Sequence, residues 1–314
     1  MTQLAQREKP VVCAVVVSYQ PQPERLRRLL ETMVLQANAV LVVDNGSRAQ
    51  SALQNLVQEA GAYFLPLAEN IGLAAGFNRG IAWAMARNAS HVMLFDQDSA
   101  PTPSMLRQML FAENWILQQG LPLAALGPAF VDVKTRVMGD VIGPEAWFTR
   151  RKRQPDLAML IRAAYLISSG KLIRTSVLRE VGLMDEKLFI DAVDTEWCLR
   201  ARNLGLECFC VTDAMMQHDL GDSSTSIGKR KIALHSPLRH YYIMRNAILL
   251  MRMAHIPWRF KCTEAYKSLR RLIGWTLLCR PRLKHLQYML RGIVDGLRGK
   301  SGPADRPPAD SGGA

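Results

Sequence analysis

Short apolar runs alternate with helical patterns over the first hundred residues, and this alternation limits the possible folds more than any other feature. The apolar runs are nearly uninterrupted, as expected for strands buried on both faces. The helical patterns repeat apolar residues every three or four positions, as at Leu26, Leu30 and Met33. Strand-like runs occupy 11–19, 39–47, 62–67 and 91–96, and helical patterns occupy 23–36, 49–60 and 72–88. This order predicts an α/β fold, with a mostly parallel central sheet and helices on both faces.

The rest of the chain is less regular. Helices are expected near 103–118 and 194–205, and strands at 126–133, 159–170, 206–211 and 214–218. We expect one α/β domain over residues 1–238, followed by a basic helical extension over 239–300. The tail 301–314 contains Pro, Gly, Ser and Asp with little to bury, which predicts a disordered end.

Positive charge is concentrated in the expected extension. Residues 239–300 contain 14 Lys and Arg but only two acids, in a chain of net charge +13. Trp258, Trp275 and Tyr288 lie among these basic residues. Such a pattern fits a helix on an anionic membrane surface, a face that binds nucleic acid, or a solvated helix that packs on its own domain.

The sequence also indicates the cellular compartment of the protein. Residues 1–10 lack the apolar segment of a secretory signal, and no run approaches the roughly 20 residues that span a bilayer. The six cysteines form no C-x-x-C pair, so free thiols in a reducing compartment are expected. We therefore expect a cytoplasmic protein, peripheral on the inner face of the cytoplasmic membrane if the extension binds lipid.

Asp96 is the last residue of the strand-like run 91–96, and Asp98 follows two residues later. Ligands of parallel sheets bind outside the carboxyl ends of the strands. Two carboxylates this close repel each other unless a cation lies between them, and Mg²⁺ or Mn²⁺ is suited to carboxylate ligands and substrate phosphates. Two solvated loop acids are the alternative, because D-x-D alone is common, but the position at a strand end favours the metal.

Other polar residues follow the first two strands. Ser18 and Tyr19 lie at the end of the first run, and Asp44 and Asn45 lie near the end of the second. A carboxylate at Asp44 could accept the imino proton of a pyrimidine base, although the segment 44–47 also suits a turn. The small residues of 69–80 would let either a nucleotide or a neighbouring strand approach a helix start. Neither a P-loop nor a G-x-G-x-x-G motif is present, which argues against P-loop NTPases and dinucleotide oxidoreductases.

Acids also gather at the start of the expected helix 194–205. One of Asp191, Asp194 and Glu196 could act as a general base. Capping of the helix would alone account for Asp194, and a helix N-terminus favours the charged form of an acid, which weakens it as a base. His218 follows a strand and is either a metal ligand or a packed histidine.

Together these motifs resemble the family 2 glycosyltransferases of the GT-A fold, and most closely the bacterial rhamnosyltransferases of that family. The resemblance covers roughly residues 11–250. The motifs that carry it are VVVSYQP, VVDNGS, ENIGLAAGFNRGI, FDQDS, ISSGKLIRTSVLREVGLMDEKLFI, VDTEWCLRARNLG and RHYYIMRN, in that order.

The resemblance implies inverting transfer of a sugar from a nucleotide sugar, with L-rhamnose from dTDP-L-rhamnose as the expected donor, to a hydroxyl of a glycan or lipid-linked saccharide. Asp194 matches the position of the catalytic base. Metal ligands are implied at Asp96, Asp98 and His218, and nucleotide contacts at Ser18, Tyr19, Asp44, Asn45, Asn70, Gly72, Asn78 and Asp96. Contacts with the donor sugar or acceptor are implied at Ser168, Ser169, Gly170, Asp191 and Glu196.

One departure from the family pattern leaves alternatives open. Val193 occupies the place of the first acid of the family's Glu-Asp pair, so a partner of the base is missing. The same chemistry with a UDP- or GDP-sugar remains possible, as does a catalytically silent membrane scaffold. A nucleic-acid-binding protein is disfavoured, because it gives no reason for acids at successive strand ends.

Overall fold

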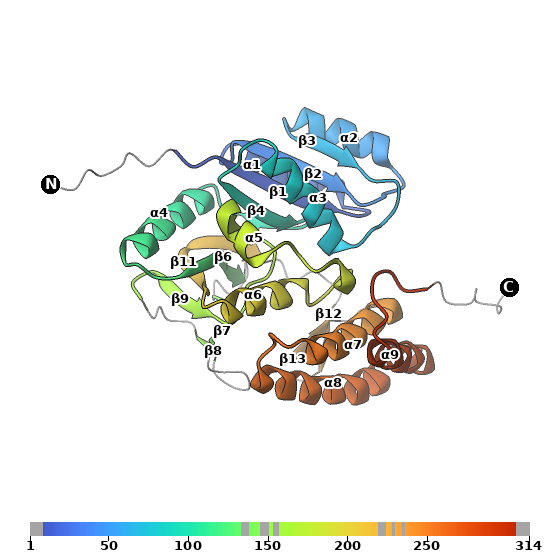
Figure 1. Ribbon diagram of the computed structural model, residues 1–314. Coiled ribbons are helices and arrows are strands. Elements are labelled where there is room, and N and C mark those ends of the chain that lie inside the picture. Colours follow the sequence, from blue (N-terminus) through green and yellow to red (C-terminus); the bar gives the residue numbers. More distant parts are fainter. Residues whose placement is uncertain are drawn as a thin grey trace.

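The computed structural model describes residues 9–132, 138–144, 151–152, 157–218, 224–227, 230–233 and 236–305. Its centre is a sheet of nine strands within these residues, in the order β3-β2-β1-β4-β10-β6-β11-β5, with β9 paired to β11 (Figure 1). The strands of this sheet are β1 (Val12–Ser18), β2 (Ala39–Asp44), β3 (Tyr63–Pro66), β4 (His91–Asp96), β5 (Ala100–Pro101), β6 (Leu123–Asp132), β9 (Leu160–Ala163), β10 (Lys171–Arg174) and β11 (Glu207–His218).

Helices and short hairpins surround this sheet. The helices of the α/β part are α1 (Pro23–Val34), α2 (Gln50–Glu59), α3 (Leu73–Met85), α4 (Met105–Gln118), α5 (Thr175–Val181), the 3₁₀ turn η1 (Glu186–Leu188) and α6 (Val193–Asn203). Two hairpins pair β7 (Val141–Ile142) with β8 (Arg151–Lys152) and β12 (Ser224–Ile227) with β13 (Arg230–Ala233).

The α/β prediction is confirmed, and the first four strands of the sheet pair in parallel as expected. Beyond them the sheet is mixed, because β10 runs antiparallel to both β4 and β6. Two strand predictions are wrong in detail. The run 159–170 is not one strand but β9 and a loop, and the runs 206–211 and 214–218 form the single strand β11, which contains a register shift between Val211 and Met215.

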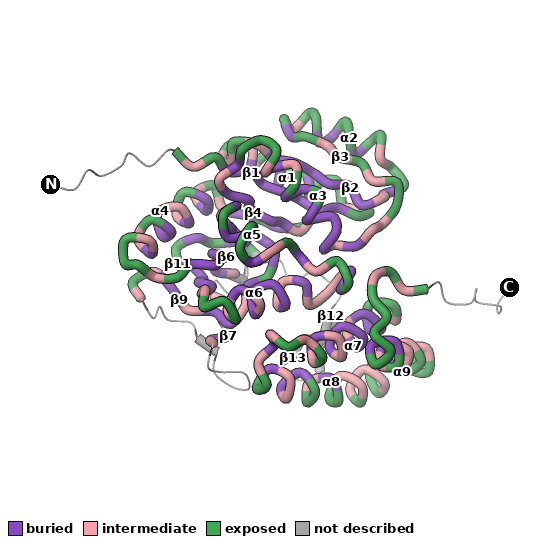
Figure 2. Tube along the Cα trace, viewed as in Figure 1, coloured by how far each residue is buried: buried purple, intermediate pink, exposed green. Residues whose placement is uncertain are grey.

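Strand β1 shows why the apolar runs form this sheet. All of its residues are buried, and successive side chains face opposite sides of the sheet. One side packs on α1 through Val16, and the other packs on α3 through Val15 and Val17. The buried strands form the continuous interior of Figure 2.

The small residues of α3 serve this packing. A Cβ added to Gly80 would lie 2.1 Å from the side chain of Val15, and one added to Gly76 would lie 2.9 Å from that of Val17. Of the two explanations offered for these glycines, close approach of a strand therefore applies to both.

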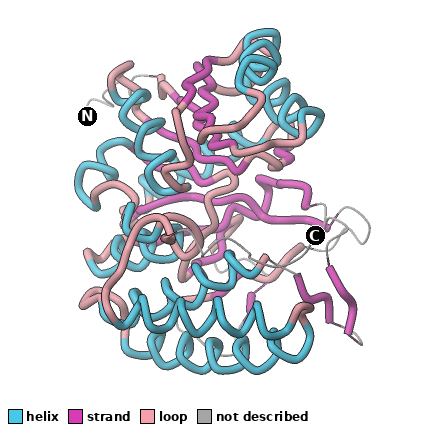
Figure 3. Tube along the Cα trace, turned by 90° about the vertical axis from the view of Figure 1, so that its right-hand side faces the viewer, coloured by secondary structure: helices cyan, strands magenta, loops and turns pink. Residues whose placement is uncertain are grey.

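The extension forms three helices, α7 (Pro237–Arg252), α8 (Trp258–Leu278) and α9 (Arg282–Leu297), which lie together at the bottom of both views (Figures 1 and 3). Close contact between α7 and α9 requires glycine, because a Cβ on Gly292 would lie 2.4 Å from the carbonyl oxygen of Tyr241. The His240 ring stacks on Trp275 at 3.9 Å between centroids. None of the helices in the described parts of the chain is long and apolar enough to cross a membrane.

Candidate active site

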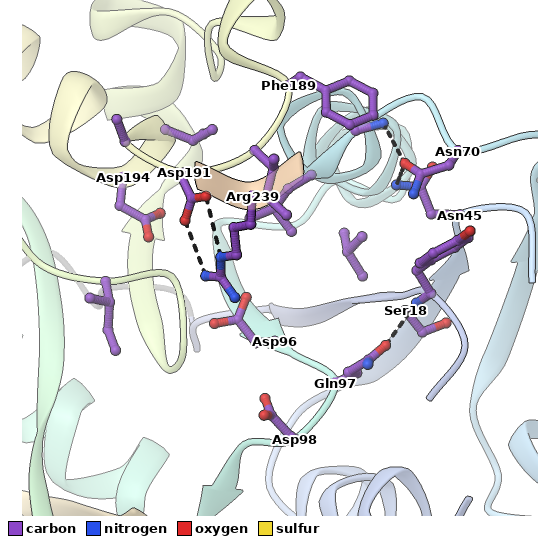
Figure 4. Close-up of a pocket in the computed structure, with 18 of the residues that line it drawn as sticks. Ser18, Asn45, Asn70, Asp96, Gln97, Asp98, Phe189, Asp191, Asp194 and Arg239 are labelled. Atoms are coloured by element: carbon purple, nitrogen blue, oxygen red, sulfur yellow. Dashed lines mark hydrogen bonds and ion pairs between the residues drawn. The ribbon is translucent and has the colours of Figure 1, made fainter. Parts of the chain in front are cut away.

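A cleft of about 590 Å³ opens at the carboxyl ends of β1 and β4, where the sequence placed the binding site. The loop before α6 and the start of α7 close its other side (Figure 4). Residues predicted for the site that line the cleft are Ser18, Tyr19, Asn45, Asn70, Gly72, Asp96, Asp98, Asp191 and Asp194. The fold therefore brings together residues that are far apart in the chain.

Asp96 ends β4 and lies close to two other acids. Burial, together with the charges of Asp194 and Asp98, raises the pKa of Asp96 to about 6, and a 2.6 Å hydrogen bond from Ser169 Oγ to Asp96 Oδ2 opposes this shift. Carboxylates whose charge is poorly compensated in a polar cleft are the donor set that a hard divalent cation prefers. The residues present therefore fit Mg²⁺ or Mn²⁺ at Asp96 and Asp98.

Asp194 is the second residue of α6, and it does not cap this helix, whose N-cap is Ala192. Its carboxylate accepts hydrogen bonds from the backbone N–H of Ser168, at 2.9 Å, and from the hydroxyl of the same residue. Lys171 Nζ lies 3.4 Å from Asp194 Oδ1 and is fully buried. The loop before β10 and the strand itself therefore fix the orientation of Asp194, whose side chain is 22% exposed toward the cleft.

Lys171 and Gln97 are site residues that sequence reasoning missed. The ammonium of Lys171 compensates part of the acidic charge, and Gln97 accepts a 2.7 Å hydrogen bond from the backbone N–H of Tyr19. Lys171 is the first residue of β10, within the SSGKLI motif and directly before the buried residues Leu172 and Ile173. A lysine in such a run is almost never fully buried without a partner, and this was the one signal in the sequence.

The loop 188–192 carries Asp191 into the cleft. Arg239, at the start of α7, binds both oxygens of Asp191 at 3.1 and 3.3 Å (Figure 4). Phe189, Asp191 and Ala192 all have φ near +60°, a conformation that costs free energy in residues with a side chain. Surrounding contacts must therefore hold this loop in place.

Two elements supply those contacts. On the α3 side, Gly72 packs on Phe189, and the backbone N–H of Leu73 donates to the Phe189 carbonyl at 2.6 Å. On the α7 side, Asn246 Nδ2 lies within 2.6–3.0 Å of the carbonyl oxygens of residues 188, 190 and 191. Arg245, which is almost completely buried, donates to the Leu188 carbonyl at 3.1 Å. The extension is thus part of the site.

Asp44 lies beneath the cleft and is fully buried. Its carboxylate accepts hydrogen bonds from the hydroxyls of Ser18 and Ser47, the backbone N–H of Ser47 and the side-chain amide of Gln50. Because Asp44 is fully buried and already accepts these hydrogen bonds, a base could contact it only if a donor such as the Gln50 amide, 3.0 Å from Asp44 Oδ2, moved away. A base contact by Asp44 stays a prediction.

Several predicted residues have structural roles outside the cleft lining. Asn78 binds both backbone groups of Met184 at 3.0 Å. Glu196 is buried, forms an ion pair with Arg200 at 2.8 Å, and has His255 Nε2 2.9 Å from its Oε1. Gly170 has φ +79° and leaves no room for a Cβ beside Pro128. None of these three residues lines the cleft, and their predicted ligand contacts stay predictions.

Two further positions remain. β11 ends at His218, whose side chain lies outside the described residues, so its predicted metal contact stays a prediction. Val193, in the place of the missing acid, is 1% exposed and packs in the apolar core.

Comparisons with known proteins agree with this geometry. The sequence model described as glycosyl transferase family 2 matches residues 13–182. The dTDP-rhamnosyl transferase RfbF of Shigella flexneri is 33% identical over 297 residues, which are 93% of this chain and 97% of RfbF. The galactofuranosyltransferase GlfT1 of Mycobacterium tuberculosis is 28% identical over 67% of this chain and 70% of its own length.

Solved structures show the same fold. S. aureus TarS 1–349 in complex with UDP-GlcNAc matches with a TM-score of 0.56 and 17% identity, over 92% of this chain and 81% of that one. GalNAc-T7 with UDP, GalNAc and Mn²⁺ matches with a TM-score of 0.57 and 9% identity, over 93% of this chain and 57% of that one. The central sheet, the acid-lined cleft and these matches lead to one conclusion: the chain is a glycosyltransferase of family 2, with the GT-A fold.

Proposed function

We propose that this enzyme transfers L-rhamnose from dTDP-L-rhamnose, with inversion, to a hydroxyl of a glycan or lipid-linked saccharide. The observation that carries the proposal is the 33% identity to a dTDP-rhamnosyl transferase over nearly the whole of both chains. Because that alignment covers 93% of this chain, it runs well past residue 182, where the family model ends.

Asp194 acts as the general base in this proposal. The acceptor hydroxyl gives its proton to Asp194, and its oxygen attacks the anomeric carbon from the face opposite the nucleotide. The bond between this carbon and the diphosphate oxygen breaks, and dTDP leaves with the electron pair. Ser168 and Lys171 hold the carboxylate in position through the contacts described above.

Asp96 and Asp98 would hold the divalent cation. When bound there, Mg²⁺ or Mn²⁺ would supply positive charge next to the diphosphate of the donor. The nucleotide would lie along Ser18, Asn45 and Asn70, with Asp44 accepting the imino proton of the base after Gln50 moves aside.

We further propose that the extension binds an anionic membrane surface. Tyr266, Leu269, Ile273 and Leu277 of α8 are spaced three or four residues apart and are each 53–60% exposed. Such spacing places them on one face of the helix. The exposed Arg259 and Arg270 lie on the same helix, and basic residues near an apolar stripe favour binding to anionic lipid.

Calorimetric titration of dTDP, UDP and GDP, each with and without Mg²⁺, tests the donor. Metal-dependent preference for dTDP is the expected result. Transfer of rhamnose from dTDP-L-rhamnose with inversion at the anomeric carbon would further support the proposal. Preference for UDP or GDP would overturn the choice of donor and keep the mechanism. Failure of all three nucleotides to bind in either condition would leave a silent scaffold.

A further inference from the structure

A second cavity, of about 290 Å³, adjoins the donor cleft on the side of the extension. The two cavities share Asp191, Ala192 and Thr195 as lining residues, and Thr195 directly follows the proposed base Asp194. α6, α7 and α8 enclose the second cavity. A substrate in this cavity would therefore reach the base from the side of the extension.

The lining of this cavity combines aromatic and charged side chains. Tyr165, Phe260 and Trp275 contribute aromatic rings. Glu264, whose side chain is 10% exposed, pairs with Arg271 and lies 3.8 Å from Lys267 Nζ. Aromatic faces and such charged groups are typical of sites that bind sugars and their anionic substituents.

A third hollow continues from this cavity to the surface of α8. It has a volume of about 330 Å³ and shares Lys267, Arg271 and Trp275 with the second cavity. Its charged lining residues in the described part of the chain are Lys267, Arg270 and Arg271, and none is acidic. Leu278, which is 43% exposed, lies at this outer end.

We propose that these two hollows form the acceptor groove and that the acceptor is a phosphate-bearing glycolipid. This inference rests on the proposed function and names the acceptor class for the same site. The accepting sugar occupies the inner cavity next to Thr195, and its phosphate lies against Lys267 and Arg271. The lipid chain leaves over Leu278 toward the exposed apolar stripe of α8. Three cations line the outer hollow against the single buried acid Glu264, and this excess of positive charge favours an anionic acceptor over a neutral glycan.

Two synthetic probes test the groove. Octyl glucosyl diphosphate has the sugar, phosphate and chain, and octyl β-D-glucoside lacks only the diphosphate. Binding is measured by calorimetry in the full-length protein with saturating dTDP and Mg²⁺, which occupy the donor site. The diphosphate probe is expected to bind at least about tenfold more tightly than the glucoside, since hydrogen bonds to charged groups are the strong ones.

Substitutions then locate the probe. Lys267→Glu should weaken binding of the diphosphate probe by about tenfold or more, and Lys267→Arg should retain it. Arg271→Gln provides a second variant. Arg259→Glu is the matched control, because Arg259 is exposed on the same helix and lines none of these cavities.

The outcomes separate this proposal from the previous one. Three results would overturn the groove assignment: equal affinity for the two probes, equal affinity for the diphosphate probe and inorganic pyrophosphate, or no effect of Lys267→Glu and Arg271→Gln on probe affinity. In each case, dTDP binding would still support the transferase. Absence of dTDP binding in the preceding titration would instead count against the proposed function. Loss of probe binding in Lys267→Glu with unchanged dTDP affinity would support the groove.

Discussion

At the scale of single residues, three carboxylates share one cleft, and burial together with their mutual repulsion sets the protonation of Asp96. Its pKa of about 6 arises from burial and from the charges of Asp194 and Asp98. A bound proton or a divalent cation relieves this repulsion. Proton and metal should therefore compete for the same carboxylate.

Metal-free protein should lose stability as the pH rises from about 4 to about 6. The folded pKa of Asp96, about 6, exceeds an unfolded value of about 3.9. The folded state therefore holds a proton that the unfolded state has lost, and the free energy of unfolding falls as the pH rises between these values. Calorimetric melting in EDTA should show this decrease, and Asp96→Asn should remove it. Glu31→Gln, at an exposed acid of α1, should leave it unchanged.

Asp194→Asn should lower kcat by about 10²–10⁴-fold, because an amide cannot accept the acceptor proton. Nucleotide affinity should change little, since the amide keeps the shape of the carboxylate. Radiolabelled sugar transfer and calorimetry measure the two effects. Glu196→Gln is the control two residues away, where the acid lies outside the cleft, and comparable loss of kcat there would contradict the assignment.

The acids of the site could be predicted from the sequence, and their partners could not. Asp96 and Asp98 follow an apolar run, so the rule for parallel strands places them at the binding edge. Lys171 contacts Asp194 only because β10 runs antiparallel beside β4, and Arg239 reaches the cleft only because α7 starts beside the loop 188–192. Neither relation leaves a periodic signal in the sequence.

At the scale of secondary-structure elements, the loop 188–192 depends on α7. Asn246→Ala removes the donor to three carbonyl groups, and the free energy of unfolding should fall by about 1–3 kcal/mol. The loop should also lose order, so that amide hydrogens of 188–192 exchange faster and kcat falls. Hydrogen exchange measured by mass spectrometry reads out the loop directly. Asn203→Ala, at an exposed amide at the end of α6, should change neither property.

Strand boundaries show where sequence periodicity fails to predict the ends of a strand. The run 159–170 is apolar almost throughout, yet the chain leaves the sheet after Ala163 and returns as β10 only after the positive-φ turn at Gly170. Conversely, Thr212 and Asp213 interrupt an apolar pattern inside the continuous strand β11. There, a register shift between Val211 and Met215 absorbs the extra residues.

At the scale of the whole molecule, the apolar stripe of α8 should direct binding to membranes. Replacing Leu269, Ile273 and Leu277 together with Gln should lower partitioning to phosphatidylglycerol-containing vesicles by about tenfold or more, since burial of each side chain contributes roughly 1.5–3 kcal/mol. Added salt should also weaken binding. Co-sedimentation with the vesicles measures the effect of the substitutions and the effect of salt. Leu35→Gln, at an 87% exposed leucine after α1, is the control, and equal binding by all variants would favour a solvated helix.

The family 2 sequence model stops at residue 182, before the loop 188–192, the proposed base and all three helices of the extension. Under the acceptor assignment proposed above, the part of the chain up to residue 182 binds the donor and the part after it binds the acceptor, so evolution can keep the first part and exchange the second. The two parts are not independent, because Gly72 and Leu73 of the donor part contact the loop 188–192 of the acceptor part. A chimera that imports a foreign acceptor part should therefore also import the matching start of α3.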